Sequence, residues 1–264
     1  MHDMSRYLER LGLSSGAGFV DMHRAHAHSI PFENLDSYLG EHVPLDLGSL
    51  ERKLVVERRG GYCFEQNLLF RAACEERGAK VETYLARVRW RTSKETPRPR
   101  AHLVLGVTTE GETWLADVGF GAGTPLEPMP FGPGGPFEQS GWTYQIVEER
   151  DERVLQRLDG DTWGDVYSFS PVPNPFVDIE MSNWYVSTHP KSPFVRGIMV
   201  SHRPADGSVE TLSNMSGSLE LTTEVPSGQA STPVDMDEVP ELLALRFGLH
   251  GFELNAEGHL AIAH

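Results

Sequence analysis

The chain has 264 residues, a hydrophobic fraction of 39% and a formal net charge of −15. This length can bury a core in one large domain or in two to three small ones, and the acidic balance argues against binding to the phosphates of nucleic acids, which requires clustered Lys and Arg. No stretch approaches the ~18 apolar residues of a membrane span, and no secretory signal is visible, so we expect a cytoplasmic protein that binds neither nucleic acid nor a membrane.

Residues 1 to about 80 read mostly as helices. Apolar residues at helical spacing predict a short first helix that ends near Gly12 or Gly16, and further helices over residues 19–28, 47–56 and 63–77, the last of them ended by Gly78. On the fourth helix Cys63, Asn67 and Cys74 share one face, together with a phenylalanine at position 70.

From residue 80 the pattern changes towards strands, which we expect over residues 81–90, 101–107, 112–118, 142–147 and 154–158. The Gly- and Pro-rich residues 121–141 predict a long loop with little regular structure. Further strands are expected near residues 196–202 and 209–212, and a closing helix over 239–247, ended by Gly248. The fold class is therefore α+β: helices, then a mainly antiparallel sheet or barrel, then a small mixed α/β end.

Cys63 follows a pair of glycines at the start of the fourth predicted helix, in the stretch RRGGYCFEQN (residues 58–67). A helix N-terminus favours negative charge and therefore the reactive thiolate, while paired glycines allow close backbone approach. A buried structural thiol is the alternative for Cys63, and it is the expected state of Cys74. The two cysteines lie about 16 Å apart if they share one helix, which excludes a disulfide.

His102 and Asp117 stand in two predicted strands that a short connection joins. In one hairpin register His102 lies opposite Asp117, and in the other, with a two-residue turn at Glu110-Gly111, Asp117 faces Val104 and is the diagonal neighbour of His102. Both registers bring the imidazole close to the carboxylate. A thiol, an imidazole and an orienting carboxylate form a set for nucleophilic catalysis, although a histidine on an apolar strand is often only a satisfied core residue.

Two further patterns carry weaker signals. Histidines 23, 26 and 28 alternate near a helix end without a matching cysteine or carboxylate cluster, so we expect no metal site. The Gly-rich residues 119–124 directly follow Asp117, and such a backbone can present N–H groups to a phosphate. A plain flexible turn is the alternative there.

Four motifs in this order resemble the arylamine N-acetyltransferases. They are IPFENL (residues 30–35), RGGYCFEQN (59–67), DVGFG (117–121) with the isolated His102 before it, and NWYVSTHPKSPF (183–194). The resemblance covers roughly residues 5 to 215, and the tail beyond has no motif that we can place.

The resemblance implies an N-terminal helical bundle (residues 1–80), a central antiparallel β-barrel (81–190) and a C-terminal α/β lid (191–264), with a core arranged as in cysteine proteases. It implies that Cys63, His102 and Asp117 form a catalytic triad without a metal. It also implies a ping-pong reaction in which acetyl-CoA acylates Cys63, CoA leaves, and a small arylamine or arylhydrazine attacks the thioester. We expect a monomer or a homodimer.

The resemblance also assigns residues by position. Four aromatics match places that face the acceptor in the family, with ordinary core packing as the alternative for each: Phe32, Phe64, Phe120 and Phe194. Four residues match cofactor-contacting segments: Gly121, Gly123, Thr124 and Ser192. Glu33 and Arg59 match a structural ion pair that supports the nucleophile loop.

Three other functions fit parts of the sequence. Macrolactam-forming amide synthases of ansamycin biosynthesis resemble these enzymes and use the same triad to pass a polyketide chain to an aryl amine. A cysteine hydrolase would use water as the acyl acceptor. A non-catalytic binding module would not need all three triad residues.

Overall fold

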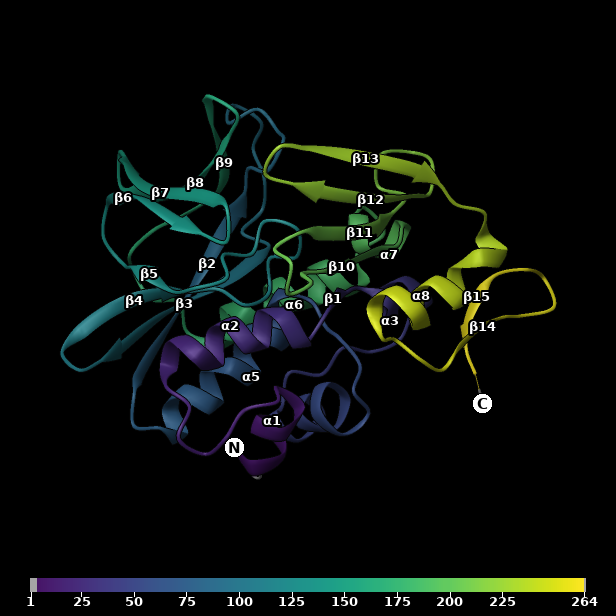
Figure 1. Cartoon of the computed structure of the whole chain (residues 1–264), viewed down its shortest axis with the longest axis horizontal. Coiled ribbons are helices and arrows are strands. Elements are labelled where there is room, and N and C mark those ends of the chain that lie inside the picture. Colours follow the sequence, from purple (N-terminus) through teal and green to yellow (C-terminus); the bar gives the residue numbers. More distant parts are fainter. Residues whose placement is uncertain (1–3, 264) are drawn as a thin grey trace.

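The computed structural model describes residues 4–263, and its N-terminal part is helical (Figure 1). The predicted helices are confirmed, with the first slightly earlier than expected and the third continuing from an α-helix into a π-helical turn. The elements are α1 (Met4–Arg10), α2 (Phe19–Ser29), α3 (Leu35–Leu39), α4 (Leu47–Leu50), η1 (Glu51–Val56) and α5 (Cys63–Glu76). Helix α5 packs on the central sheet, and its buried Leu69 and Ala73 belong to the same core cluster as Leu103 and Leu105 of that sheet.

The centre is a nearly closed antiparallel sheet of eight strands in the order β5-β4-β3-β2-β9-β8-β7-β6 (Figure 1). Five of the strands correspond to predicted ones. The strands are β2 (Lys80–Val88), β3 (His102–Thr109), β4 (Glu112–Ala116), β5 (Met129–Pro130), β6 (Gly134–Gln139), β7 (Trp142–Glu149), β8 (Glu152–Asp159) and β9 (Thr162–Phe169).

The β3–β4 hairpin takes the second of the two predicted registers. Thr109 pairs with Glu112, and Leu105 pairs with Ala116. Glu110 and Gly111 form the two-residue turn with φ angles of 54° and 84°, as the right-handed twist of a hairpin favours. Continuing the register places Asp117 across from Val104, so the direct His102–Asp117 pairing was wrong and the diagonal one is correct.

The expectation of a long irregular loop over residues 121–141 was wrong, because β5 and β6 lie within it. Strand β6 carries Gly and Pro and is largely exposed, and among the strands of residues 4–263 it pairs only with β7, across an irregular register. An edge strand tolerates such residues, which elsewhere signal a loop.

The sequence also gave no sign of β9 or of α6 (Phe176–Thr188). In α6 the polar Asn183 and Ser187 are buried, while Met181 and Trp184 are 68% and 63% exposed. The buried positions of α6 recur with the helical period, but the apolar residues do not. The sequence of α6 therefore lacks the pattern that identifies an amphipathic helix.

The C-terminal part contains a second antiparallel sheet, in the order β1-β10-β11-β12-β13, whose edge strand β1 comes from the N-terminal part. Helix α8 packs on this sheet through Val239 and Leu243, and it ends at Gly248 with φ 65°, as expected. The elements are β1 (Phe32–Glu33), α7 (Pro193–Arg196), β10 (Met199–His202), β11 (Val209–Ser213), β12 (Glu220–Val225), β13 (Gly228–Pro233), η2 (Met236–Glu238), α8 (Val239–Phe247), β14 (Phe252–Leu254) and β15 (Leu260–Ile262).

The fold is thus α+β, with helices, a nearly closed sheet and a smaller C-terminal sheet. The proposed boundaries at residues 80 and 190 and the likeness of the core to cysteine proteases stay predictions. Over residues 4–263 no helix is both long and apolar enough to cross a membrane.

Candidate active site

Cys63 is the first residue of α5 and is 3% exposed. The two glycines before it allow the chain to pass its neighbours closely. A Cβ on Gly60 would collide with the carbonyl oxygen of Pro31, and one on Gly61 would lie 2.9 Å from a carboxylate oxygen of Glu65. The Gly-Gly pair is therefore required by close packing at the entry to the helix.

His102 begins β3 and lies between Cys63 and Asp117. Its Nε2 is 2.8 Å from Oδ2 of Asp117, and both side chains are buried. Burial opposes protonation of the imidazole, but the charges of Asp117 and Cys63 and hydrogen bonds to both raise the pKa of His102 to about 10. Since Nε2 faces the carboxylate, Nδ1 is the nitrogen left for the thiol, an arrangement that suits proton transfer at sulfur.

Asp117 is held in its ionised form by the groups around it. Burial alone would raise its pKa, yet His102, Asn67 and the N–H of Gly119 together lower it. The N–H of Gly119 donates to Oδ1 at 3.0 Å. A carboxylate held in this way fixes the imidazole orientation and tautomer.

Asn67, one turn after Cys63 on α5, joins the helix to the sheet. Its Nδ2 donates to the carbonyl of Leu103 at 2.8 Å and to Oδ1 of Asp117 at 3.0 Å, and its Oδ1 accepts from the N–H of Val118. The sequence placed Asn67 on the same helix face as Cys63 but gave it no function. A buried amide on the nucleophile's face of the helix is the signal that could have identified it.

Another group that the sequence did not assign is His23 of α2. Its Nε2 accepts from the N–H of Asp117 at 3.2 Å, while Nδ1 bonds the carbonyl of Leu126. Burial lowers the pKa of His23 to about 4, so it is neutral and can accept this hydrogen bond. Among the residues that the structure describes, no group of three or more His, Cys, Asp or Glu side chains is placed to hold a metal.

Two of the four predicted acceptor-facing aromatics are half-buried. Phe120 lies edge-on to His102 with ring centroids 5.0 Å apart, and Phe194 contacts Phe32 and Tyr62. By contrast, Phe64 is fully buried and Phe32 is 5% exposed, which matches the core-packing alternative.

The residues predicted to approach the cofactor serve the protein's own packing. A Cβ on Gly121 would press on the ring of Phe32, and one on Gly123 on the ring of Phe120, while Thr124 is buried. The hydroxyl of Ser192 is buried, donates to the carbonyl of Val186 and accepts from an N–H in α7. Cofactor contacts by these residues therefore stay predictions.

The ion pair assigned to Glu33 and Arg59 is present. Arg59 Nη2 lies 2.7 Å from Glu33 Oε1 and 2.7 Å from Asp36 Oδ1. Glu33 also accepts from the N–H of Leu35 at 2.7 Å, so its carboxylate is satisfied although fully buried.

The chain is similar to known proteins over nearly its full length. A family model described as N-acetyltransferase matches residues 17–254. The arylamine N-acetyltransferase of Mycobacterium tuberculosis is 34% identical, covering 98% of this chain and 93% of the relative. That of Mycolicibacterium smegmatis is 40% identical over 75% of this chain and 76% of its own.

A solved structure, the arylamine N-acetyltransferase of Mycobacterium marinum in complex with CoA, superimposes with a TM-score of 0.88 and 34% identity, covering 94% of this chain and 93% of the other. These comparisons give no support to the amide-synthase alternative. The resemblance carried by the four motifs is confirmed: the chain is an acyltransferase and belongs to the arylamine N-acetyltransferase family.

Proposed function

We propose that this enzyme transfers an acetyl group from acetyl-CoA to a small arylamine or arylhydrazine by a ping-pong reaction through a thioester on Cys63. The observation that supports this most directly is the buried hydrogen bond between Asp117 and His102, together with the influence of Cys63 on the pKa of that imidazole and the place of the thiol at the start of α5. The CoA complex of the Mycobacterium marinum relative supports CoA as the carrier.

In the first half-reaction Nδ1 of His102 holds the proton of the Cys63 thiol, because the raised pKa of the imidazole favours its protonated form, and the sulfur attacks the acetyl carbonyl carbon. The bond from that carbon to the CoA sulfur breaks. Nδ1 then returns the proton to the departing CoA thiolate. Asp117 stabilises the imidazolium that exists between the two proton transfers.

In the second half-reaction the amine nitrogen attacks the carbonyl carbon of the Cys63 thioester. His102 removes the proton from the nitrogen, the carbon–sulfur bond breaks, and the proton returns to Cys63. The N-acetylated product leaves and the free thiol is restored. One imidazole therefore serves as base and acid in both halves, as microscopic reversibility requires.

For the acceptor we propose Phe120 and Phe194 as aromatic walls, since these two predicted aromatics retain exposed surface and Phe120 borders His102. The loop of residues 121–124 is proposed to lie beside the donor because it continues directly from Phe120. The cytoplasmic location and the monomeric or homodimeric state remain expectations.

The test is intact-protein mass spectrometry after mixing with acetyl-CoA alone, comparing the wild type with Cys63→Ser. We expect a gain of one acetyl group on the wild type, its loss when an arylamine is added, and no gain on the variant. Acetylation of the amine by a wild-type protein that never carries the adduct would refute the ping-pong route. An equal adduct on the variant would remove Cys63 from the reaction.

A further inference from the structure

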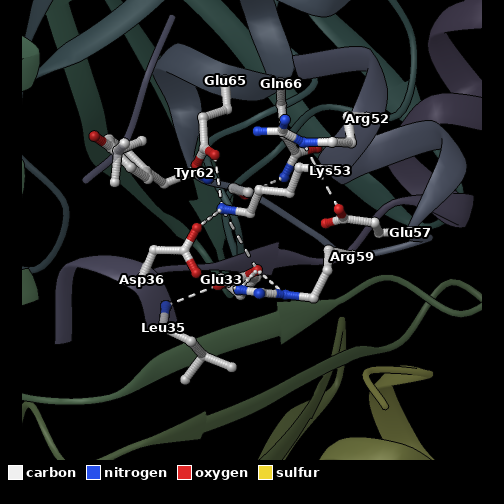
Figure 2. A network of polar contacts seen from close by, with 12 residues as sticks. Glu33, Leu35, Asp36, Arg52, Lys53, Glu57, Arg59, Tyr62, Glu65 and Gln66 are labelled. Atoms are coloured by element: carbon white, nitrogen blue, oxygen red, sulfur yellow. Dashed lines mark hydrogen bonds and ion pairs between the residues drawn. The ribbon is translucent and has the colours of Figure 1, made fainter. Parts of the chain in front are cut away.

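A buried network of ion pairs lies beside the residues that precede Cys63 in the chain, and Lys53 of η1 is at its centre (Figure 2). The Lys53 ammonium is 2.7 Å from Oε1 of Glu65 and 2.6 Å from Oδ2 of Asp36. The Lys53 and Glu65 side chains are only 12% and 2% exposed. Ion pairs this deep are sensitive to the loss of either partner.

The carboxylate of Glu65 connects this network to the backbone next to Cys63. While Oε1 bonds Lys53, Oε2 accepts from the N–H of Tyr62 at 3.0 Å. Tyr62 is the N-cap of α5, and Cys63 is the next residue. One side chain therefore determines where the helix that carries the thiol begins.

The opposite side of the network is fixed by the pairing of Arg59 with Glu33 and Asp36, and the Arg59 guanidinium also lies 4.8 Å from the ring centroid of Phe252. Lys53 is thus held between an acidic pair that Arg59 anchors and the carboxylate that caps α5.

A cavity of about 560 Å³ is lined by Lys53, Glu65 and Arg59, with His42 among its other lining residues. None of the three triad residues lines it. The cavity therefore borders Glu65 and does not border the thiol.

We propose that Glu65 and Lys53 are positioning residues for Cys63: the ionised Glu65 carboxylate, held by Lys53, fixes the N–H of Tyr62 and so the place of the thiol, which makes acylation depend on the protonation of Glu65. This inference rests on the proposed role of Cys63 as the nucleophile.

The charges that face Glu65 support a change in the protonation of its carboxyl near neutral pH. Burial and the nearby Glu33 and Asp36 raise the pKa of Glu65 to about 7, against the opposing effect of Lys53. Arg59 offsets the two acids, and His42 lines the same cavity. Below this pH the neutral carboxyl no longer pairs with Lys53 and is a weaker acceptor for the N–H of Tyr62. Acylation should therefore slow on acidification.

The experiment measures the single-turnover rate of Cys63 acylation by acetyl-CoA between about pH 6 and about pH 9, from intact mass. Glu65→Gln is compared with Glu75→Gln, a matched control on the same helix whose carboxylate is 42% exposed and pairs with Arg71. We expect Glu65→Gln to be slower by about 10- to 100-fold at the higher pH, and to lack a step near pH 7 that the wild type and the control retain. The KM for the amine should not change.

Lys53→Met and Lys53→Arg keep the inference testable if Glu65→Gln fails to fold. Lys53→Met should move the step to higher pH because Glu65 loses its cation, while Lys53→Arg should restore the wild-type profile. His42→Gln should keep the step, which separates it from titration of that imidazole.

Equal rates and equal pH profiles for Glu65→Gln and Glu75→Gln would overturn the inference, even where Cys63→Ser abolishes acylation and so upholds the proposed function. A pH step that disappears in His42→Gln would overturn it as well. Acylation that survives in Cys63→Ser would instead overturn the proposed function itself, and the inference with it.

Discussion

The contact between Gly119 and Cys63 leads to the sharpest prediction. A Cβ built on Gly119 would lie 2.9 Å from Cα of Cys63 and 3.2 Å from Nδ2 of Asn67. The backbone of Gly119 is outside the left-handed region, so an alanine meets no strain from its own dihedral angles there. The substitution Gly119→Ala therefore perturbs the structure only by steric contact.

The magnitude follows from this contact. Ordinary Cβ contacts begin at 3.4 Å, so Cys63 and Gly119 must separate by about half an ångström. Such overpacking costs about 1–3 kcal/mol of the free energy of unfolding. The same displacement moves the thiol relative to His102, and a catalytic geometry tolerates only about 0.5 Å. We expect kcat/KM to fall by about 10- to 100-fold.

The assay is N-acetylation of an arylamine with thermal unfolding measured in parallel. Gly132→Ala is the matched control, because a Cβ there meets nothing within 4 Å. The control should keep both the activity and the melting temperature. A Gly119→Ala enzyme that turns over as fast as the control would refute the reasoning that this contact sets the position of the thiol.

Two further predictions concern the His102–Asp117 pair. Asp117→Asn keeps an oxygen for Asn67 and Gly119 but turns an amide N–H towards Nε2 of His102, which puts the imidazole proton on Nδ1. We expect kcat/KM to fall by about 10³- to 10⁴-fold while the fold is retained. A loss of activity below tenfold would contradict this prediction. The pKa of His102 is raised from 6.5 to about 10 in the folded state, so its contribution to stability is complete below pH 6.5 and is lost as the pH rises through 10. In urea unfolding, the stability advantage of the wild type over Asp117→Asn should therefore shrink across this range, and an advantage that grows would have the wrong sign.

The sequence predicted the start of α5 at Cys63 and the contact of His102 with Asp117 because both depend on local signals. The glycine pair and the apolar run located the start of α5, and two alternative hairpin registers both kept His102 near Asp117. The choice between the registers depended on the Glu110-Gly111 turn, and the structure shows the two-residue form. Contacts within one hairpin and the start of one helix can thus be inferred before the fold is known.

The supporting groups could not be predicted in the same way. His23 reaches Asp117 across 94 residues, and Lys53 meets Glu65 only because α4, which continues into η1, packs against α5. The sequence around a single histidine or lysine in a helix does not indicate such a contact. Likewise, β6 and α6 were missed since their composition does not follow their burial.

The three hydrogen bonds of Asn67 also bear on how the protein folds. They join α5 to residues 36, 50 and 51 positions further along the chain. Helix α5 can form from local contacts, whereas closing segments of this length is slow because the entropy of the loops is lost before the contacts form. A chain with a formed helix and an undocked sheet therefore carries a thiol without its imidazole. On refolding we expect helical signal to return before Cys63 becomes reactive, so that acyl transfer begins only once the sheet has docked.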